Sequence, residues 1–285
     1  MRKARWTAAG LLLLLATGHP RAGEVPWAQV PGADALNGAQ REVMEEVLSG
    51  APCYGPCRGT LLSCLGETPV DPIARRLAAF AVRRVRADRD AEEILKEIEN
   101  RRISAFPPKT FAPDLQKTPM CGSPKARVRI VLYADFGCPY CKATATALRA
   151  LVRENPERVA FYFKNYPLKA NERAVPAALA LLAAERQGKF WEMHDLLFAG
   201  DDDLSDAYFD ASATKLGLDL GRFHADMKGK AAVDRIRAEK MEAIQYGVER
   251  TPGILVNGKV YRGVRTWEEL SDRIDEEYDL LGPAK

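Results

Sequence analysis

The chain has few of the nitrogen ligands that zinc prefers beside cysteine, because it contains only three histidines. A zinc site needs about four ligands, and no second Cys-x-x-Cys motif or His pair follows the one Cys-x-x-Cys motif at residues 138–141. We therefore expect no metal site. The sequence also lacks internal repeats and low-complexity tracts.

Long apolar runs are also scarce. The one that stands out is Leu11–Leu15, within the apolar stretch 8–17, and the basic residues Arg2, Lys3 and Arg5 precede it. This pattern predicts a secretory signal peptide over residues 1–23, and the run is too short to span a bilayer. No second such segment follows, so we expect an exported, soluble mature protein without stable membrane insertion.

Neither positive nor negative charge is in large excess, with 42 Lys and Arg residues against 39 Asp and Glu residues. The formal net charge of +3 falls to zero once Arg2, Lys3 and Arg5, the basic residues before the apolar run, are removed. A basic surface for nucleic acid is therefore not expected. Six cysteines in an exported chain are compatible with an oxidising compartment, such as a periplasm.

The chemistry-bearing motif is Cys138-Pro139-Tyr140-Cys141, which follows a predicted strand at 127–134 (RVRIVLYA) and opens a predicted helix. At a helix start, unpaired N–H groups and the helix dipole favour thiolate over thiol. Cys138 is therefore the expected nucleophile. Cys141, one turn further along, is the expected resolving thiol. The alternatives are a zinc half-site and a structural disulfide.

Composition divides the rest of the chain into an N-terminal module and a larger C-terminal part. Residues 24–105 contain a cysteine-dense stretch, then a helix capped by Asp71 with Pro72 at its first position, then a second helix beginning near Asp90. Residues 106–120 carry four prolines, a composition that suits a linker. We expect the catalytic domain to occupy residues 121–285.

Residues 121–285 are predicted to form an α/β domain in which a helical segment lies between the second and third strands. A second strand at 159–164 should pair in parallel with the first. Asn257-Gly258 is a strong turn signal for a hairpin between 253–256 and 259–261. Helices are expected at 171–187, 189–198, 205–216, 219–227, 231–246 and 266–280.

In this order of elements, about residues 121–281 resemble the DsbA-like thiol:disulfide oxidoreductases of the thioredoxin superfamily. The resemblance rests on YADFGCPYC, FYFKNYPLKA, GKFWEMHDLLF and YGVERTPGILVNGKVYRG. It implies a thioredoxin fold with a helical insertion at about 170–247. The 111 positions from Cys141 to Pro252 are too many for a bare thioredoxin or glutaredoxin.

The resemblance also implies roles for residues around the redox pair. Thr251-Pro252 would form a cis-proline loop, whose backbone at Thr251 pairs with the substrate like an added strand. Pro139 and Tyr140 would contact the substrate as well. Thioredoxins carry a buried acid six positions before the nucleophile, where this chain has Leu132. A proton carrier for the resolving thiol is therefore not assigned.

Three further polar residues lie near the expected site in sequence or strand layout. Asp135 and Lys164 could tune the redox pair, although Asp135 could equally face solvent or cap the helix. His194 lies in an apolar helical stretch of the insertion. We expect it to be a packed histidine with its hydrogen bonds satisfied.

The other cysteines are Cys53, Cys57, Cys64 and Cys121, and the Cys-x₃-Cys-x₆-Cys spacing of the first three fits no standard zinc or haem signature. Four thiols allow three pairings. We expect two structural disulfides, with Cys121 tying the linker or the N-terminal module to the catalytic domain. The alternative is that one pair relays electrons to the CPYC pair.

Together these features predict an exported enzyme that exchanges disulfides with cysteines of other exported proteins and is recycled by a redox partner protein, without a dissociable cofactor. Within the class, a reductase or isomerase is the alternative, for example in cytochrome c maturation. EEILKEIENR at 92–101 resembles the helical domain of CcmH-type cytochrome c biogenesis thiol proteins, although their Cys-x-x-Cys is absent. Outside the class, a binding module with a structural CPYC disulfide remains open.

Overall fold

The structure is a computed structural model that describes residues 24–200 and 203–282. The expected signal peptide lies outside these residues. The described chain forms two compact units, divided between Ile94 and Leu95. Among the described residues, no helix combines the length and the apolar character needed to cross a membrane.

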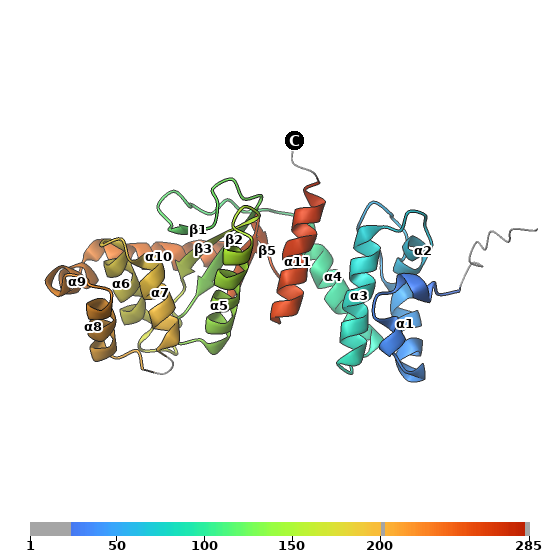
Figure 1. Cartoon of the computed structure of the whole chain (residues 1–285), viewed down its shortest axis with the longest axis horizontal. Helices are drawn as coiled ribbons and strands as arrows, with labels where there is room; N and C mark the ends of the chain where they lie inside the picture. Colours follow the sequence, from blue (N-terminus) through green and yellow to red (C-terminus); the bar gives the residue numbers. More distant parts are fainter. Residues whose placement is uncertain (1–23, 201–202, 283–285) are drawn as a thin grey trace, which may run out of the picture. The chain divides into compact units, whose positions relative to one another are not determined.

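The first unit is helical (Figure 1). Its elements are the 3-10 turns η1 (Trp27–Gln29) and η2 (Ala33–Ala35) and the helices α1 (Gly38–Gly50), α2 (Leu61–Leu65) and α3 (Pro72–Arg86). The predicted start of α3 is confirmed, because the Asp71 carboxylate accepts hydrogen bonds from the N–H groups of Ile73 and Ala74. Helices α1 and α3 bury their apolar faces against each other.

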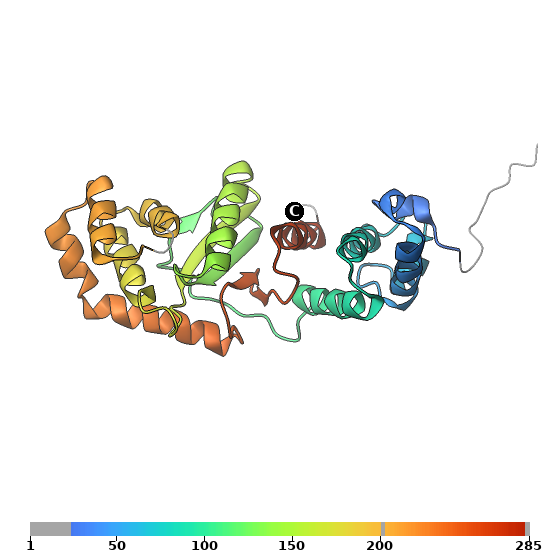
Figure 2. The same cartoon turned by 90° about the horizontal axis from the view of Figure 1, so that it is seen from below.

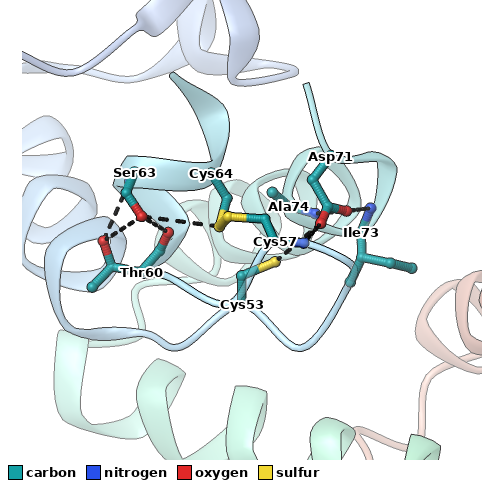
Figure 3. The surroundings of a disulfide bond; sticks show 8 residues. All are labelled: Cys53, Cys57, Thr60, Ser63, Cys64, Asp71, Ile73 and Ala74. Atoms are coloured by element: carbon teal, nitrogen blue, oxygen red, sulfur yellow. Dashed lines mark hydrogen bonds between the residues drawn. A yellow bond between two sulfur atoms is a disulfide. The ribbon is translucent and has the colours of Figure 1, made fainter. Parts of the chain in front are cut away.

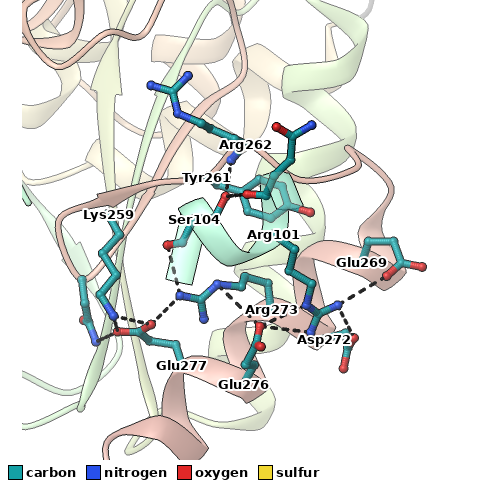
Figure 4. A network of polar contacts seen from close by, with 12 residues as sticks. Arg101, Ser104, Lys259, Tyr261, Arg262, Glu269, Asp272, Arg273, Glu276 and Glu277 are labelled. Carbon is teal, nitrogen blue, oxygen red and sulfur yellow. Dashed lines mark hydrogen bonds and ion pairs between the residues drawn. The ribbon is translucent and has the colours of Figure 1, made fainter. Parts of the chain in front are cut away.

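Helix α4 (Ala91–Ala105) crosses the division between the units, so the boundary differs from the expected one at 106–120. The physical reason is a buried ion network in the second unit. Arg101 of α4 pairs with Asp272 and Glu276 of helix α11 (Trp267–Leu280), as Figure 4 shows. The C-terminal half of α4 therefore belongs to the catalytic unit, and residues 106–119 follow it without helix or strand.

The second unit is built on a five-stranded sheet in the order β1-β3-β2-β4-β5. Its strands are β1 (Met120–Cys121), β2 (Val128–Ala134), β3 (Val159–Asn165), β4 (Gly253–Val256) and β5 (Lys259–Val260). The expected parallel pair is present, with Val128 opposite Val159, whereas β4 runs antiparallel to β2. Strand β1, which the sequence did not indicate, pairs antiparallel with β3.

The two faces of the sheet are covered by different helices (Figures 1 and 2). Alternate side chains of β2 and β3 point to opposite faces, as the period of two requires. Ile130, Leu132 and Phe163 join a core with α5 (Pro139–Glu154) and α11. Val131 and Tyr133 instead join a second core with α10 (Lys230–Gln245).

The helical insertion follows β3 and returns to the sheet at β4. It consists of α6 (Ala174–Glu185), α7 (Phe190–Ala199), α8 (Asp206–Lys215), α9 (Leu220–Met227) and α10. Alanine-rich α6 is buried almost all round, which is expected of a helix packed among its neighbours. The core of α6 to α9 is continuous with the core beneath α5, so the insertion supports the motif helix directly.

The β4–β5 hairpin turns at Asn257-Gly258, as predicted from the sequence. Both residues have positive φ, 50° and 77°, the conformation that favours this dipeptide in tight turns. A side chain at Gly258 would collide with the backbone of Phe111, whose N–H donates to the Gly258 carbonyl over 2.8 Å. The turn thus also anchors the segment that follows α4.

Candidate active site

The motif cysteines lie where the carboxyl end of β2 passes into α5. Cys138 is the N-cap of the helix and Pro139 is its first residue, a position that proline tolerates because no N–H partner is needed there. Cys141, Ala145, Leu148 and Val152 recur on one face of the helix and are buried against the sheet. The first cysteine is therefore half-buried and reachable, whereas the second is fully buried.

The two thiols, free in this structure, have opposite ionisation properties. A hydrogen bond from the Cys141 thiol, supported by the N–H groups of Cys141 and Tyr140, lowers the pKa of Cys138 from its ordinary value near 9 to about 6. Burial and the adjacent Cys138 sulfur raise the pKa of Cys141 well above its usual range. The site therefore holds one accessible thiolate and one protonated, buried thiol at neutral pH.

Thr251 and Pro252 reach the pair from the other end of the insertion. Their peptide bond is cis, as the resemblance implies, and they directly precede β4. The Thr251 hydroxyl is buried beside the sulfurs, where it favours the thiolate of Cys138. Tyr140, between the cysteines, is 73% exposed. The structure thus brings Cys138, Cys141, Thr251 and Pro252 together, with Tyr140 at the rim.

Asp135 is buried, and its carboxylate holds the loop before Cys138 in place. One carboxylate oxygen accepts from the Gly137 N–H at 2.8 Å and from the Asn171 amide at 2.7 Å, and the other accepts from the Leu168 N–H at 2.6 Å. Both oxygens are thus used to tie this loop to the segment after β3. Asp135 is neither solvent-facing nor a cap of α5 through its side chain.

Gly137 is required by the close approach of Asn171 in this loop. A Cβ at position 137 would lie 1.9 Å from the amide nitrogen of Asn171. Any side chain there would displace the amide that Asp135 holds. The glycine before the nucleophile therefore has a packing reason as well as a place in the motif.

Lys164 lies on the face of the sheet opposite to the thiols. Its ammonium contacts the Glu242 carboxylate at 2.5 Å, and the same carboxylate oxygen accepts from the Tyr133 hydroxyl at 2.6 Å. The hypothesis that Lys164 tunes the redox pair is not supported by this arrangement. Leu132, at the position of the thioredoxin acid, is fully buried in the core that contains Cys141.

His194 is packed in the core, as expected, but only one of its two ring nitrogens has a hydrogen-bond partner in the described part of the chain. Its ring lies within aromatic contact of Phe136, Phe163 and Phe198, and its Nδ1 lies 2.9 Å from the Asp195 carboxylate. Nε2 has no hydrogen-bond partner among the described residues. Burial lowers the pKa of His194, so the ring is neutral.

The N-terminal unit holds one disulfide, between Cys57 and Cys64 (Figure 3). Cys53 lies beside it as a buried free thiol and contacts the Asp71 carboxylate, which also accepts from the Cys57 N–H at 2.7 Å. Burial and this carboxylate raise the pKa of Cys53 to about 11. Glu67 lies near the bonded sulfurs, but a disulfide does not ligate metal as thiolates do.

Cys121 is a free thiol as well, so the structure contains one of the two expected structural disulfides. It lies on β1 in the second unit, where the Arg149 guanidinium approaches its sulfur at 2.8 Å. Arg149 also pairs with Asp195. Cys121 is therefore bonded to no other cysteine in this structure, and a cation rather than a sulfur is its partner.

Two arginines at the site were not indicated by the sequence. Arg250 and Arg265 line the same cavity as Tyr140 and Pro252, and an Arg265 nitrogen donates to the Pro252 carbonyl. Both follow the insertion, more than 100 positions after the motif. Such a separation leaves no local pattern that would connect them to it.

The family model described as "Thioredoxin" matches residues 114–276. The Na(+)/H(+) antiporter NhaA 3 of Salinispora tropica is 31% identical over 255 residues, which is 87% of this chain and 37% of that protein. The chain thus spans about a third of the length of that curated relative.

Solved structures show the same fold. A thioredoxin-like oxidoreductase from Silicibacter pomeroyi is 25% identical with a TM-score of 0.53, covering 59% of this chain and 99% of its own. Oxidised BdbD from Bacillus subtilis is 20% identical with a TM-score of 0.54, covering 60% of this chain and 97% of its own. The expected thioredoxin fold with a helical insertion is confirmed.

Proposed function

The chain belongs to the thioredoxin family, and we propose that it is a thiol:disulfide oxidoreductase that uses Cys138 as nucleophile and Cys141 as resolving thiol. The observation that carries this proposal is the contrast between the two sulfurs. With a pKa of about 6, roughly nine-tenths of Cys138 is thiolate at pH 7, against about one-hundredth of an ordinary cysteine. The buried partner thiol keeps its proton until it is needed.

The exchange proceeds in two steps. In the reducing direction, the Cys138 thiolate attacks one sulfur of a substrate disulfide, the substrate S–S bond breaks, and the departing sulfur takes up a proton. Cys141 then loses its proton and attacks the Cys138 sulfur, which releases the second substrate thiol. The substrate gains two electrons and two protons, and the enzyme is left with a Cys138–Cys141 disulfide. Oxidation of a dithiol substrate is the reverse.

The electrostatics favour the oxidising direction. Each interaction that lowers the pKa of Cys138 stabilises the reduced enzyme, and a stabilised reduced form makes the corresponding disulfide a better oxidant. The chain would then donate disulfides to its substrates. A reductase or isomerase is the alternative, and the equilibrium potential separates the two.

Substrate docking would use the loop at Thr251-Pro252. The backbone beside the cis peptide lies next to the thiols and directly precedes β4, outside the residues that β4 pairs with β2 and β5, which suits pairing with an extended substrate segment. Pro139 and the exposed ring of Tyr140 would contact the same segment. Substrates are therefore proteins that present a cysteine in an accessible, extended stretch.

We place this activity outside the cytoplasm, on exported proteins, because the first 23 residues have the sequence of a secretory leader. A second redox protein would recycle the pair after each turnover. Sodium–proton antiport, the activity named for the Salinispora relative, is not proposed, because the match covers only 37% of that protein.

The experiment compares Cys138→Ser, Cys141→Ser and, as a matched control, Cys121→Ser, a free thiol outside the pair. Cys138→Ser should abolish exchange with a peptide disulfide, Cys141→Ser should accumulate mixed disulfides, and the control should keep wild-type rates. Thiolate absorbance of the reduced protein should titrate near pH 6 only where Cys138 is present. Exchange at equal rates in all variants would eliminate the proposal, and no exchange even in the wild type would favour a binding module.

The direction is read from the equilibrium of the pair with glutathione. A disulfide donor should have a potential near about −120 mV, whereas a reductant should lie near about −270 mV. A value at the reducing end would replace the donor with the reductase. It would leave the assignment of the two cysteines intact.

A further inference from the structure

A groove beside the redox pair is apolar along most of its length. A cavity of about 310 Å³ is lined by Tyr140, Pro252, Ile254, Trp267 and Leu270, together with neighbouring polar groups. Tyr140 and Trp267 are 73% and 40% exposed, so two large aromatic residues at this groove are open to solvent. The groove thus starts at Tyr140, two residues after Cys138, and offers apolar contact to a substrate that is attacked there.

Two guanidinium groups line this otherwise apolar groove. Arg250 and Arg265 both face it, and no carboxylate among the described residues forms an ion pair with either. Elsewhere in the unit, part-buried arginines such as Arg149 and Arg235 have carboxylate partners. Two positive charges that no described carboxylate holds in an ion pair therefore line the same groove, and the sulfurs of the redox pair are among the groups of opposite sign that act on Arg265.

The position of Arg265 is fixed by the docking loop itself. One of its nitrogens donates to the Pro252 carbonyl, which holds the guanidinium beside the loop that would pair with the substrate. Partial burial and the neighbouring Arg250 charge lower the pKa of Arg265. An arginine nonetheless stays protonated in proteins, so both groups are cations, and the Cys138 thiolate offsets only part of their mutual repulsion.

We propose that this groove selects substrate segments that carry an aspartate or glutamate close to the reactive cysteine, with Arg250 and Arg265 as the specificity-determining residues. The inference rests on the proposed function. An entering carboxylate would accept bidentate hydrogen bonds from a guanidinium and would offset the repulsion between the two cations. The acidic residue would lie within a few positions of the cysteine, because both arginines line the cavity that Tyr140 and Thr251 share beside the redox pair.

The experiment uses three peptides that differ at one position, with Glu, Gln or Lys two residues from a cysteine activated as a neutral 2-pyridyl disulfide. Attack by Cys138 forms the enzyme–peptide disulfide, breaks the bond to the pyridyl sulfur and releases protonated 2-thiopyridone, which is followed by absorbance. The readout is the ratio of second-order rate constants for the Glu and Gln peptides. A ratio cancels changes in the nucleophile's own reactivity.

We expect the Glu peptide to react about fivefold faster than the Gln peptide at low salt, and the Lys peptide to react slowest. The preference should shrink in about 0.5 M salt, because exposed charges are screened. Arg250→Met and Arg265→Met should each lower the ratio toward one, and Arg265→Lys should keep part of it. Arg262→Met, which removes a charge from the same loop outside this groove, should leave the ratio unchanged.

Equal rates for the Glu and Gln peptides in the wild type would overturn the proposal while leaving the exchange activity in place. A preference that survives in both Arg250→Met and Arg265→Met would also overturn it, because the selectivity would then come from elsewhere. No release from any peptide would instead refute the proposed function, and the selectivity with it. Arg250 is exposed, so its variant keeps the test valid even where Arg265→Met folds poorly.

Discussion

Replacement of Arg101 by methionine should destabilise the catalytic unit, although position 101 lies before the expected linker. The Arg101 side chain is 3% exposed and reaches three acidic residues of α11. Its nitrogens lie 2.7 Å from Asp272, 3.1 Å from Glu276 and 3.8 Å from Glu269 (Figure 4). Methionine keeps much of the apolar volume and removes only the charge and its hydrogen bonds.

The magnitude follows from what the substitution leaves behind. Glu269 and Glu276 are 4% and 0% exposed, so water does not easily replace the lost guanidinium. Removing one partner of a buried ion pair costs about 3–5 kcal/mol, because the remaining charge stays desolvated. Arg273 stays nearby and offsets part of this cost. We expect a loss of about 3 kcal/mol in the free energy of unfolding.

The assay is urea unfolding, followed in parallel by far-ultraviolet circular dichroism and by loss of disulfide exchange. Arg102→Met is the matched control, since Arg102 is the next residue of the same helix and pairs with Glu99 at the surface, where the two side chains are 39% and 44% exposed. An exposed pair of this kind is worth less than about 1 kcal/mol. The control should therefore unfold close to the wild type.

A loss below about 1 kcal/mol for Arg101→Met would refute this reasoning and move the start of the catalytic unit beyond α4. The pairing itself is tested by Glu276→Gln, which neutralises the most buried of the acids. The double variant should be less destabilised than the sum of the two single variants, because they share one interaction. Additive losses would show that the two side chains do not act on each other.

Two further predictions concern the site and its support. In the wild type, the free energy of unfolding should fall as the pH drops below about 6.5, because His194 binds a proton in the unfolded chain but stays neutral when buried. His194→Leu should make this pH dependence weaker. Urea midpoints measured against pH test this, and parallel curves for the wild type and the variant would contradict it. Gly137→Ala should slow disulfide exchange by about tenfold, because the new methyl group would displace the Asn171 side chain. Gly38→Ala is the control, since the space around Gly38 is open. Equal exchange rates for Gly137→Ala and the wild type would show that the loop tolerates a side chain.

Local sequence signals predicted the catalytic fold because each acts over a few residues. The apolar runs of β2 and β3 sit within a residue of the expected strands, and Asn257-Gly258 set the hairpin. The helices of the insertion also fall close to the expected ranges. The short strand at Met120–Cys121 was missed because its two residues become a strand only by pairing with β3.

The partners of side chains far apart in sequence could not be predicted in the same way. Composition placed a boundary at the proline-rich segment, but the buried pairing of Arg101 with α11 draws the end of α4 into the second unit. Cysteine spacing left three pairings open, and the fold joins Cys57 to Cys64 alone. Arg265 reaches the redox pair only after the chain has returned through the whole insertion.

The missing buried acid changes how the resolving thiol can be activated. In the reduced protein burial raises the pKa of Cys141, and the hydrogen bond between the two sulfurs adds to this effect while it lowers the pKa of Cys138. A mixed disulfide on Cys138 removes the negative charge and with it this restraint on Cys141.

This chain has Leu132 at the position where thioredoxins carry a buried acid. Two neutral donors favour the Cys141 thiolate instead, namely the N–H of Asp135 and the hydroxyl of Thr251. Neutral donors stabilise the thiolate without binding its proton, so the proton must pass to water or to the departing substrate sulfur. The same donors act whichever way the electrons run. The direction is therefore set by the stability of the Cys138 thiolate, and a buried base is not needed to choose it.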